Sequence, residues 1–203
     1  SIVQSVAANP VVWIVLLVVL LMAVIVGAIG AVIGSGGAAN SAEDYTYQAQ
    51  VSEQTESYRD MVVDYCEKYG IDDYVDLCLA VIEQESGFLP DVMQTEQSYY
   101  NVNPPIDTAE ESIDCGTHEL SDCLTKAKSK SPNDIKGISL ALQGYNFGNG
   151  YIDWALKNYG CYSKENAEIF SQKMCVELGY DSYGDVEYVP HVLRYYIANP
   201  ETT

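Results

Sequence analysis

Apolar residues recur at helical spacing over most of the chain after residue 50. The stretch VSEQTESYRDMVVDYCEKYG, residues 51–70, has apolar positions three and four apart and closes on Gly70, which predicts an amphipathic helix. The next stretch, DDYVDLCLAVIEQESG, holds an almost unbroken apolar run that ends before Gly87 and predicts a buried helix over about 73–86. Residues 88–113 then read as a long loop, because QSYYNVNPP carries turn residues and adjacent prolines. Loops of such length are usually functional.

Five later stretches also show helical apolar spacing. They are THELSDCLTKAKSK, SPNDIKGISLALQGYNFG, GYIDWALKN, SKENAEIFSQKMCVEL and DVEYVPHVLRYY, and Pro190 belongs in the first turn of the last one. We find no convincing alternating strand and no internal repeat. The predicted fold class is therefore all-α.

The N-terminal part of the chain has a different character. Residues 11–34, VVWIVLLVVLLMAVIVGAIGAVIG, are apolar apart from glycines and long enough to cross a hydrocarbon layer of about 30 Å. A cleaved signal peptide is the competing interpretation, but its apolar region is usually shorter and follows a basic start. We therefore expect a flank at 1–10, a transmembrane anchor at 11–34, a flexible linker at 35–51 and one globular domain at 52–203.

The distribution of charge indicates on which side of the membrane that domain lies and which class of ligand it does not bind. No charged residue occurs in the first 42 positions, and the first basic residue is Arg59. A cytoplasmic flank usually carries Lys or Arg close to the membrane, so we expect a single-pass membrane protein with its C-terminal domain outside the cell. The formal net charge of −19 argues against binding nucleic acid through a broad electrostatic surface.

Six cysteines all lie after the anchor, at positions 66, 78, 115, 123, 161 and 175. No C-x-x-C pair occurs and there are two histidines, His118 and His191, so we predict neither a metal site nor a cofactor. Up to three disulfides are expected outside the cell. Cys66 with Cys78 could join adjacent helices and Cys115 with Cys123 could close a short loop, whereas a helix between Cys161 and Cys175 would hold that pair apart.

Glu85 is the strongest catalytic candidate from its local environment. It falls in the last turn of the buried helix, where its neighbours at three and four residues are apolar. Burial and the negative end of the helix both disfavour a carboxylate, so its pKa should be raised. An acid that is still protonated near neutral pH can protonate a glycosidic oxygen. Glu83, on another side of the helix, is expected to face water.

Four sequence blocks occur in the order known from one enzyme family. They are AVIEQESG at 80–87, DVMQ at 91–94, ISLALQGYNFGNGYIDWA at 138–155 and YGDVEYVPHVLRYY at 183–196. With them, residues 52–198 resemble the lysozyme-like muramidase domain of cell-wall hydrolases from Gram-positive conjugative elements. More distantly, the chain is similar to goose-type lysozymes and soluble lytic transglycosylases.

The resemblance implies roles for individual residues. Glu85 would be the catalytic acid and Ser86 would orient it. Met93 and Gln94 match an element that lines the sugar groove, and Tyr145 and Asn146 match a pair that faces the catalytic glutamate. Tyr188 is a weaker groove candidate. His118 and His191 are left as structural residues.

A second carboxylate would be needed as base or nucleophile in a hydrolase, and its identity stays open. Asp91, Glu96, Glu110, Glu111 and Asp185 are all candidates, and none is favoured by its spacing. Without such a group, the substrate's own acetamido group could assist, as in a lytic transglycosylase.

The expected function is hydrolysis of the β-1,4 bond between N-acetylmuramic acid and N-acetylglucosamine in peptidoglycan. By analogy with the family, the wall would be opened locally for a conjugation or type IV secretion apparatus, whose proteins would be partners. A catalytically weak, glycan-binding scaffold of that apparatus is the rival hypothesis.

Overall fold

The computed structural model describes residues 45–85, 87 and 90–200. The predicted anchor at 11–34 lies outside the described residues, as does Ser86. Within the described ranges, none of the helices combines the length and the apolar character that a membrane crossing requires. The described part is mostly helical and packs around one hydrophobic core.

The helix predicted over 51–70 is divided into two. Helix α3 spans Glu53–Glu56 and α4 spans Arg59–Tyr69. The Ser52 hydroxyl accepts a hydrogen bond from the Thr55 backbone N–H at 3.3 Å and so caps α3. Glu83 accepts hydrogen bonds from the same Ser52 hydroxyl at 2.8 Å and from the Thr55 hydroxyl, so it anchors α3 rather than simply facing water.

The buried helix is confirmed and forms the centre of the core. A short 3-10 turn, η1, covers Asp72–Tyr74, and α5 follows at Val75–Glu85. All residues from Leu77 to Ile82 are completely buried, so this helix is enclosed on every side over those turns. The C-terminal end of α5, with Glu83 and Glu85, is only partly buried and lies at the edge of the core.

Helix α6 is longer than predicted. It spans Ala109–Ala127, so the loop before it ends at Thr108. The Thr108 hydroxyl accepts from the Glu111 backbone N–H at 3.2 Å, and the Glu111 carboxylate accepts from the Thr108 N–H at 3.1 Å. This is a capping box, and its T-x-x-E pattern is the signal that the sequence interpretation missed.

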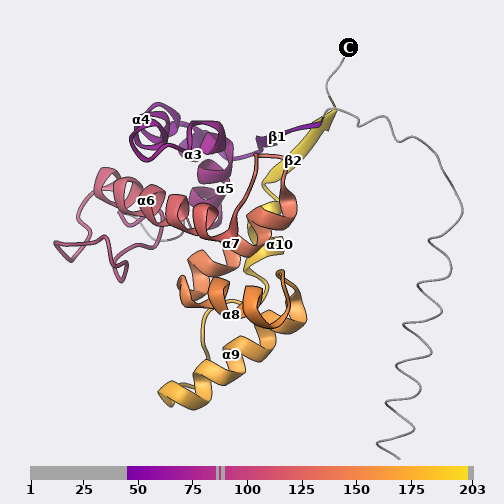
Figure 1. Cartoon of the computed structure of the whole chain (residues 1–203). Coiled ribbons are helices and arrows are strands. Elements are labelled where there is room, and N and C mark those ends of the chain that lie inside the picture. Colours follow the sequence, from indigo (N-terminus) through magenta and orange to yellow (C-terminus); the bar gives the residue numbers. More distant parts are fainter. Residues whose placement is uncertain (1–44, 86, 88–89, 201–203) are drawn as a thin grey trace, which may run out of the picture. The chain divides into compact units, whose positions relative to one another are not determined.

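The remaining helices follow their predicted segments. They are α7 at Ile135–Phe147, α8 at Gly150–Asn158, α9 at Lys164–Leu178 and α10 at Tyr188–Leu193. Pro190 is the third residue of α10, in its first turn as expected. In Figure 1, α3, α4 and α6 lie at one end of the domain, α8 and α9 lie at the other, and α5, α7 and α10 lie between.

One two-stranded antiparallel sheet corrects the expectation of a purely helical domain. Strand β1 spans Tyr45–Ala49, in the predicted linker, and pairs with β2 at Tyr196–Pro200. The Tyr47 ring stacks on the Tyr196 ring with centroids 5.2 Å apart. Each strand has five residues, and the pairing joins the two ends of the domain. No local sequence pattern therefore predicts this sheet.

All six cysteines are free thiols in the structure, so the expected disulfides are not supported. Cys115 and Cys123 are both on α6, eight residues or about 12 Å apart along its axis, which rules out the proposed short loop. Cys161 and Cys175 are separated by α9, as predicted. The sulfurs of Cys66 and Cys78 lie 3.6 Å apart in the core, so α4 and α5 are in close contact there without a disulfide bond.

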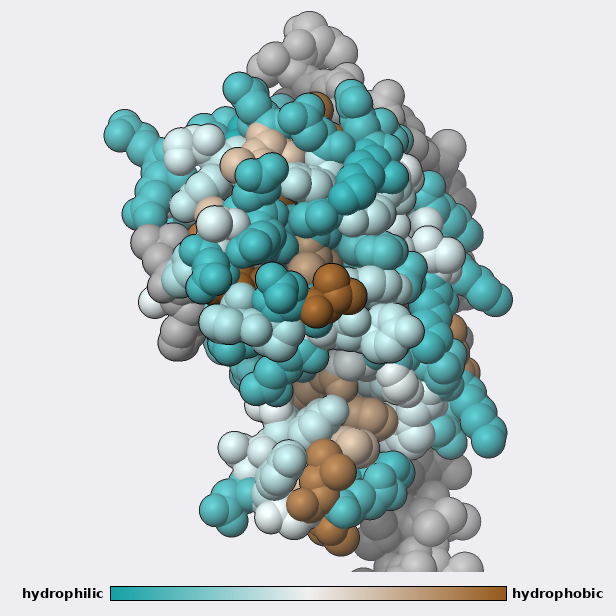
Figure 2. All heavy atoms as spheres, turned by 90° about the vertical axis from the view of Figure 1, so that its left-hand side faces the viewer, coloured by the Kyte–Doolittle hydropathy of each residue, from teal (hydrophilic) through white to brown (hydrophobic). Residues whose placement is uncertain are grey.

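The surface is predominantly hydrophilic on the face turned toward the viewer in Figure 2. Hydrophobic residues gather at the lower end of that face, over α9, where Val176 is 85% exposed and Leu178 is 47% exposed. Exposed hydrophobic side chains also occur in the loop before α6, where Tyr99 is 91% exposed and Val102 is 92% exposed.

Candidate active site

A groove with a volume of about 900 Å³ lies among the described residues. Its walls come from the loop after α5, from α6, from the C-terminal end of α7 and from the segment 180–184. A volume of this size is within the range of ligand-binding clefts. Three carboxyl groups, Asp91, Glu96 and Glu119, are among the described residues that line it, and no lysine or arginine is.

Glu85 is the last residue of α5 and lies beside this groove. It is partly buried, and Gly87 and Pro90, just beyond it, line the groove. Burial raises the pKa of the Glu85 carboxyl, and the negative charges of Asp185 and Asp91 raise it further. The apolar turns before Glu85 explain the burial, as the sequence indicated.

Tyr188 opposes this rise in pKa to a limited extent. Its hydroxyl interacts with the Glu85 carboxyl and lowers the pKa of that group, less than burial raises it. The hydroxyl is buried, and among the described residues it has no partner at ordinary hydrogen-bond geometry. Tyr188 is 2% exposed, so it lies behind the groove rather than in its wall. The Tyr188 hydroxyl is therefore available to donate a hydrogen bond to Glu85 when that carboxyl is ionised.

Tyr145 connects Glu85 to the groove. It lines the groove, and its ring stacks on the Tyr188 ring with centroids 6.4 Å apart. Its hydroxyl donates to the Met93 carbonyl at 2.8 Å. Burial raises the pKa of the Tyr145 phenol well above its usual value, with repulsion from Glu119 and Glu85 adding to the effect. Tyr145 is therefore a neutral phenol near both glutamates.

Met93 and Gln94 have different positions although they are adjacent. Met93 is completely buried and is not part of the groove wall; its backbone N–H donates to the Ser112 hydroxyl at 2.9 Å. Gln94 is exposed, lines the groove and has a left-handed backbone with φ of 54°. That turn directs the two side chains to opposite sides of the loop.

Asn146 lines the groove and also holds its far wall. Its side-chain oxygen accepts from the Asp185 backbone N–H at 2.7 Å, while buried Gln143 donates to the Asp185 carbonyl at 2.9 Å. A Cβ on Gly184 would come within 2.4 Å of the Phe147 ring, and its φ of 57° also favours glycine. The segment 182–185 is thus fixed tightly against the end of α7.

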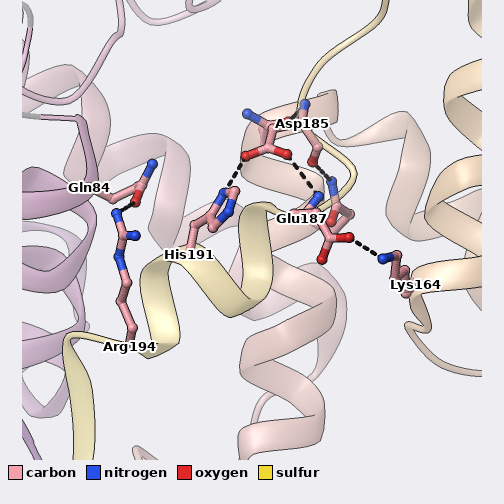
Figure 3. A network of polar contacts seen from close by, with 8 residues as sticks. Gln84, Lys164, Asp185, Glu187, His191 and Arg194 are labelled. Carbon is pink, nitrogen blue, oxygen red and sulfur yellow. Dashed lines mark hydrogen bonds and ion pairs between the residues drawn. The ribbon is translucent and has the colours of Figure 1, made fainter.

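Two of the five candidate second carboxylates, Asp91 and Asp185, are engaged in hydrogen bonds beside the groove. Asp91 accepts from the Ser112 hydroxyl at 2.6 Å and from the Thr95 and Glu96 backbone N–H groups, each at 2.8 Å. Asp185 contacts His191 Nδ1 at 2.7 Å and accepts from the Glu187 N–H at 2.8 Å (Figure 3). Both carboxylates therefore stabilise the backbone around the groove.

The other three candidates differ in access. Glu96 is exposed and lines the groove. Glu110 accepts a hydrogen bond from Tyr65 at 3.2 Å, and Glu111 forms the capping box of α6; neither belongs to the groove wall. The structure thus does not bring these two to the same place as Glu85.

Further polar contacts hold α10 in place near Glu85. Arg194 donates to the Gln84 side-chain oxygen at 2.9 Å, which links the end of α10 to the end of α5 (Figure 3). Lys164 forms an ion pair with Glu187 at the start of the same helix. Because Tyr188 directly follows Glu187, these contacts help to position its ring.

Glu119 is a groove residue that the sequence interpretation missed. It lies on α6, partly buried, and burial raises the pKa of its carboxyl; the Ser98 hydroxyl bonds to it and lowers the pKa, and Asp122 raises it. Glu119 is four residues before the buried Cys123 and so lies at the border of the apolar face of α6. That position is the sequence signal that could have identified it.

The two histidines have structural contacts. The His118 ring is stacked between Tyr69, with centroids 4.2 Å apart, and Tyr100, at 3.7 Å. This stack ties the long loop to α4 and α6. His191 is paired with Asp185.

Comparison with known proteins identifies the family. The sequence matches the Lysozyme-like family over residues 52–199. The chain belongs to the lysozyme-like family. The match covers all the helices described above, from α3 to α10, and excludes β1.

Individual relatives of this lysozyme-like chain agree with that assignment. It is 35% identical over 146 residues to the bifunctional muramidase/DL-endopeptidase CwlT of Bacillus subtilis (strain 168), which covers 71% of this chain and 42% of CwlT. It is 27% identical over 124 residues to the uncharacterized membrane protein YocA of the same organism, covering 61% of this chain and 53% of YocA. The chain thus spans about half or less of the length of these relatives.

One solved structure resembles this chain in fold. It is a Staphylococcus aureus subsp. aureus Mu50 protein described as similar to a lipoprotein of the NLP/P60 family. The TM-score is 0.62 and the identity is 29%, with 75% of this chain and 55% of the other covered.

Proposed function

We propose that this domain is an N-acetylmuramidase, which cleaves the β-1,4 bond between N-acetylmuramic acid and N-acetylglucosamine in peptidoglycan, with Glu85 as the general acid. The observation that carries the proposal is the buried carboxyl at the end of α5, whose raised pKa favours the protonated form beside a groove. The membership of the lysozyme-like family and the similarity to the muramidase CwlT support a peptidoglycan substrate.

In the proposed first step, Glu85 gives its proton to the glycosidic oxygen as the bond to the anomeric carbon breaks. The carboxyl becomes a carboxylate in a buried position, which is costly unless a donor meets it. The Tyr188 hydroxyl supplies that donor, because it interacts with Glu85 and lacks another partner of ordinary geometry among the described residues. Tyr188 therefore stabilises the product state of the proton transfer.

The second step determines the product. In a hydrolase, water attacks the anomeric carbon, and Glu85 as carboxylate or a second carboxylate can accept its proton. Asp91 and Asp185 carry several protein hydrogen bonds each, which makes either a poor nucleophile. Glu96, which is exposed in the groove wall, is the remaining candidate base for hydrolysis. The engagement of Asp91 and Asp185 favours, as the second candidate function, a lytic transglycosylase in which a substrate hydroxyl attacks the anomeric carbon, gives its proton to the Glu85 carboxylate and forms a 1,6-anhydro sugar.

Location is the finer part of the proposal. The apolar segment at 11–34 would anchor the chain in the cell membrane and hold the domain on the outer side, next to the wall. Tethering raises the local concentration of the enzyme at its substrate and confines cleavage to one place. Local wall opening for a conjugation or secretion apparatus would use such confinement, and the proteins of that apparatus would be the partners.

The test incubates the 203-residue chain with purified peptidoglycan, beside a Glu85→Gln variant and an exposed control, Glu168→Gln on α9. Mass spectrometry of the released fragments identifies the reaction. Reducing muropeptides mean hydrolysis, and fragments lighter by one water mean transglycosylation. We expect release by the parent and by Glu168→Gln, and none above background by Glu85→Gln.

Two results would contradict the proposal in different ways. Full activity of Glu85→Gln would remove Glu85 from the mechanism while leaving the enzyme class intact. Glycan binding without release of fragments by either protein would identify a glycan-binding scaffold instead of an enzyme.

A further inference from the structure

The α6 wall of the groove contains a carboxyl group with an unusual environment. Glu119 lines the groove opposite the end of α5, and it is only partly accessible. The titratable groups that act on it or respond to it are Cys115, Asp122 and Cys123 on α6, Tyr145 on α7 and Tyr100 on the loop. None of these is a cation. An ionised Glu119 would therefore lack a positive partner among them.

The Ser98 hydroxyl occupies one side of this carboxyl. Ser98 lies in the long loop and lines the same groove, and its side chain hydrogen-bonds Glu119. That loop segment is fixed on α6, since the Tyr100 ring stacks on His118 with centroids 3.7 Å apart and the Tyr100 hydroxyl bonds to Asp122. The Glu119 carboxyl is thus held by its own helix and by the loop, and Glu119 lines the groove.

We propose that Glu119 is a substrate-binding residue, whose neutral carboxylic acid donates a hydrogen bond to the carbonyl oxygen of an acetamido group of the glycan. The proposal rests on the proposed function, which supplies a substrate with one such group on each sugar. A neutral acid has one O–H donor and one acceptor oxygen. Ser98 satisfies the acceptor, so the O–H group is available for the ligand. Burial, and to a smaller extent Asp122, raise the pKa of Glu119 and so favour its protonated form.

Glutamine is an informative replacement because its amide also offers a donor group, the NH2, and an acceptor oxygen, but it cannot ionise. Alanine removes both. Glu119→Gln should therefore bind glycan as the parent does, whereas Glu119→Ala should bind about tenfold more weakly, the ratio expected for one buried hydrogen bond of about 1.4 kcal/mol. Ionisation of the acid should weaken binding in the parent as pH rises, and Glu119→Gln should not show this dependence.

The experiment measures the dissociation constant of peptide-free peptidoglycan strands in the Glu85→Gln background, so that cleavage does not interfere. Parent, Glu119→Gln, Glu119→Ala and the control Glu168→Ala are compared over a range of pH, with strands that carry their N-acetyl groups and with N-deacetylated strands. Thermal unfolding checks that each variant is folded. We expect the tenfold loss in Glu119→Ala to disappear on N-deacetylated strands.

Each contrary result has a distinct meaning. Equal binding by Glu119→Ala and the parent would overturn the role of Glu119 alone. A loss in Glu119→Gln as large as that in Glu119→Ala would show that an ionised carboxylate is required and would overturn the neutral-acid proposal. If Glu119→Ala does not fold, the pH profiles of the parent and Glu119→Gln still decide, because parallel profiles contradict the proposal. No glycan binding by the parent would overturn the proposed function as well.

Discussion

Replacing Gly116 with alanine probes the contact that supports the groove from behind. Gly116 lies within α6 and faces Met93, the residue whose carbonyl accepts the Tyr145 hydrogen bond. A Cβ at position 116 would lie 2.6 Å from the Met93 sulfur and 2.7 Å from the Met93 Cβ. The sulfur can move by rotation of the side chain. The Met93 Cβ is fixed to the backbone, so the loop itself must shift.

Two opposing effects determine the stability of Gly116→Ala. Alanine is favoured over glycine inside a helix by about 1 kcal/mol. Overpacking a close core contact costs about 1–3 kcal/mol, and the fixed Met93 Cβ places this site in the upper part of that range. We therefore expect a net loss of about 1–2 kcal/mol, which lowers the melting temperature by roughly 2–8 °C in a domain of this size.

Urea unfolding followed by circular dichroism measures this difference, with Gly150→Ala as the matched control. Gly150 is the first residue of α8, and a Cβ there would meet nothing within 4 Å, so this variant should be as stable as the parent or slightly more stable. If Gly116→Ala were stabilised to the same extent as Gly150→Ala, the close packing of α6 on Met93 would be wrong.

Three further predictions concern the site and the core. The pKa of Glu85 is raised in the folded state, so the parent loses folding stability as pH rises from the unfolded-state pKa of this carboxyl to its folded-state pKa. Above the folded-state pKa, Glu85→Gln should therefore be more stable than the parent. Urea unfolding at several pH values measures the difference. The activity of the parent should fall as pH rises through the raised pKa of folded Glu85, because the acid then loses its proton; a pH–rate profile measures this. Tyr145→Phe leaves the Met93 carbonyl without this donor and should cost about 1–3 kcal/mol; an unchanged unfolding midpoint would show that the bond contributes nothing. Oxidised glutathione should slowly join Cys66 and Cys78, 3.6 Å apart, with transfer of both thiol hydrogens to the oxidant, and should raise stability by about 3 kcal/mol. The reaction is slow because hydrogen bonding to Cys66 and burial raise the pKa of the Cys78 thiol, and absence of the bond in mass spectra after long incubation would contradict it.

Much of the helical architecture was predictable from the sequence, because apolar spacing and terminal glycines are local signals. The buried helix and the position of Glu85 at its end came directly from the run DLCLAVIEQE. The helices around Ile138, Phe170 and Pro190 followed from the same spacing. The start of α6 was missed although the capping pattern of Thr108 and Glu111 is equally local. That error was one of interpretation.

Other features depend on contacts between distant segments and had no local signal. The pairing of Tyr45–Ala49 with Tyr196–Pro200 depends on the two ends of the domain meeting. The hydrogen bonds that occupy Asp91 come partly from Ser112 on α6. Sequence spacing could not distinguish such an engaged carboxylate from an available one, which is why the list of second carboxylates stayed open.

By itself, then, the sequence determined which segments are helical, which helix is buried and which glutamate ends it, because these depend on residues within a few positions of one another. Only the tertiary structure decided that Tyr188 meets Glu85, that Asp91 and Asp185 are engaged in hydrogen bonds with Ser112 and His191, and that Glu119 lines the groove. The physical reason is that the charge state and the partners of a side chain depend on burial and on atoms within a few ångströms of it. Folding brings those atoms from α5, α6, α7 and α10.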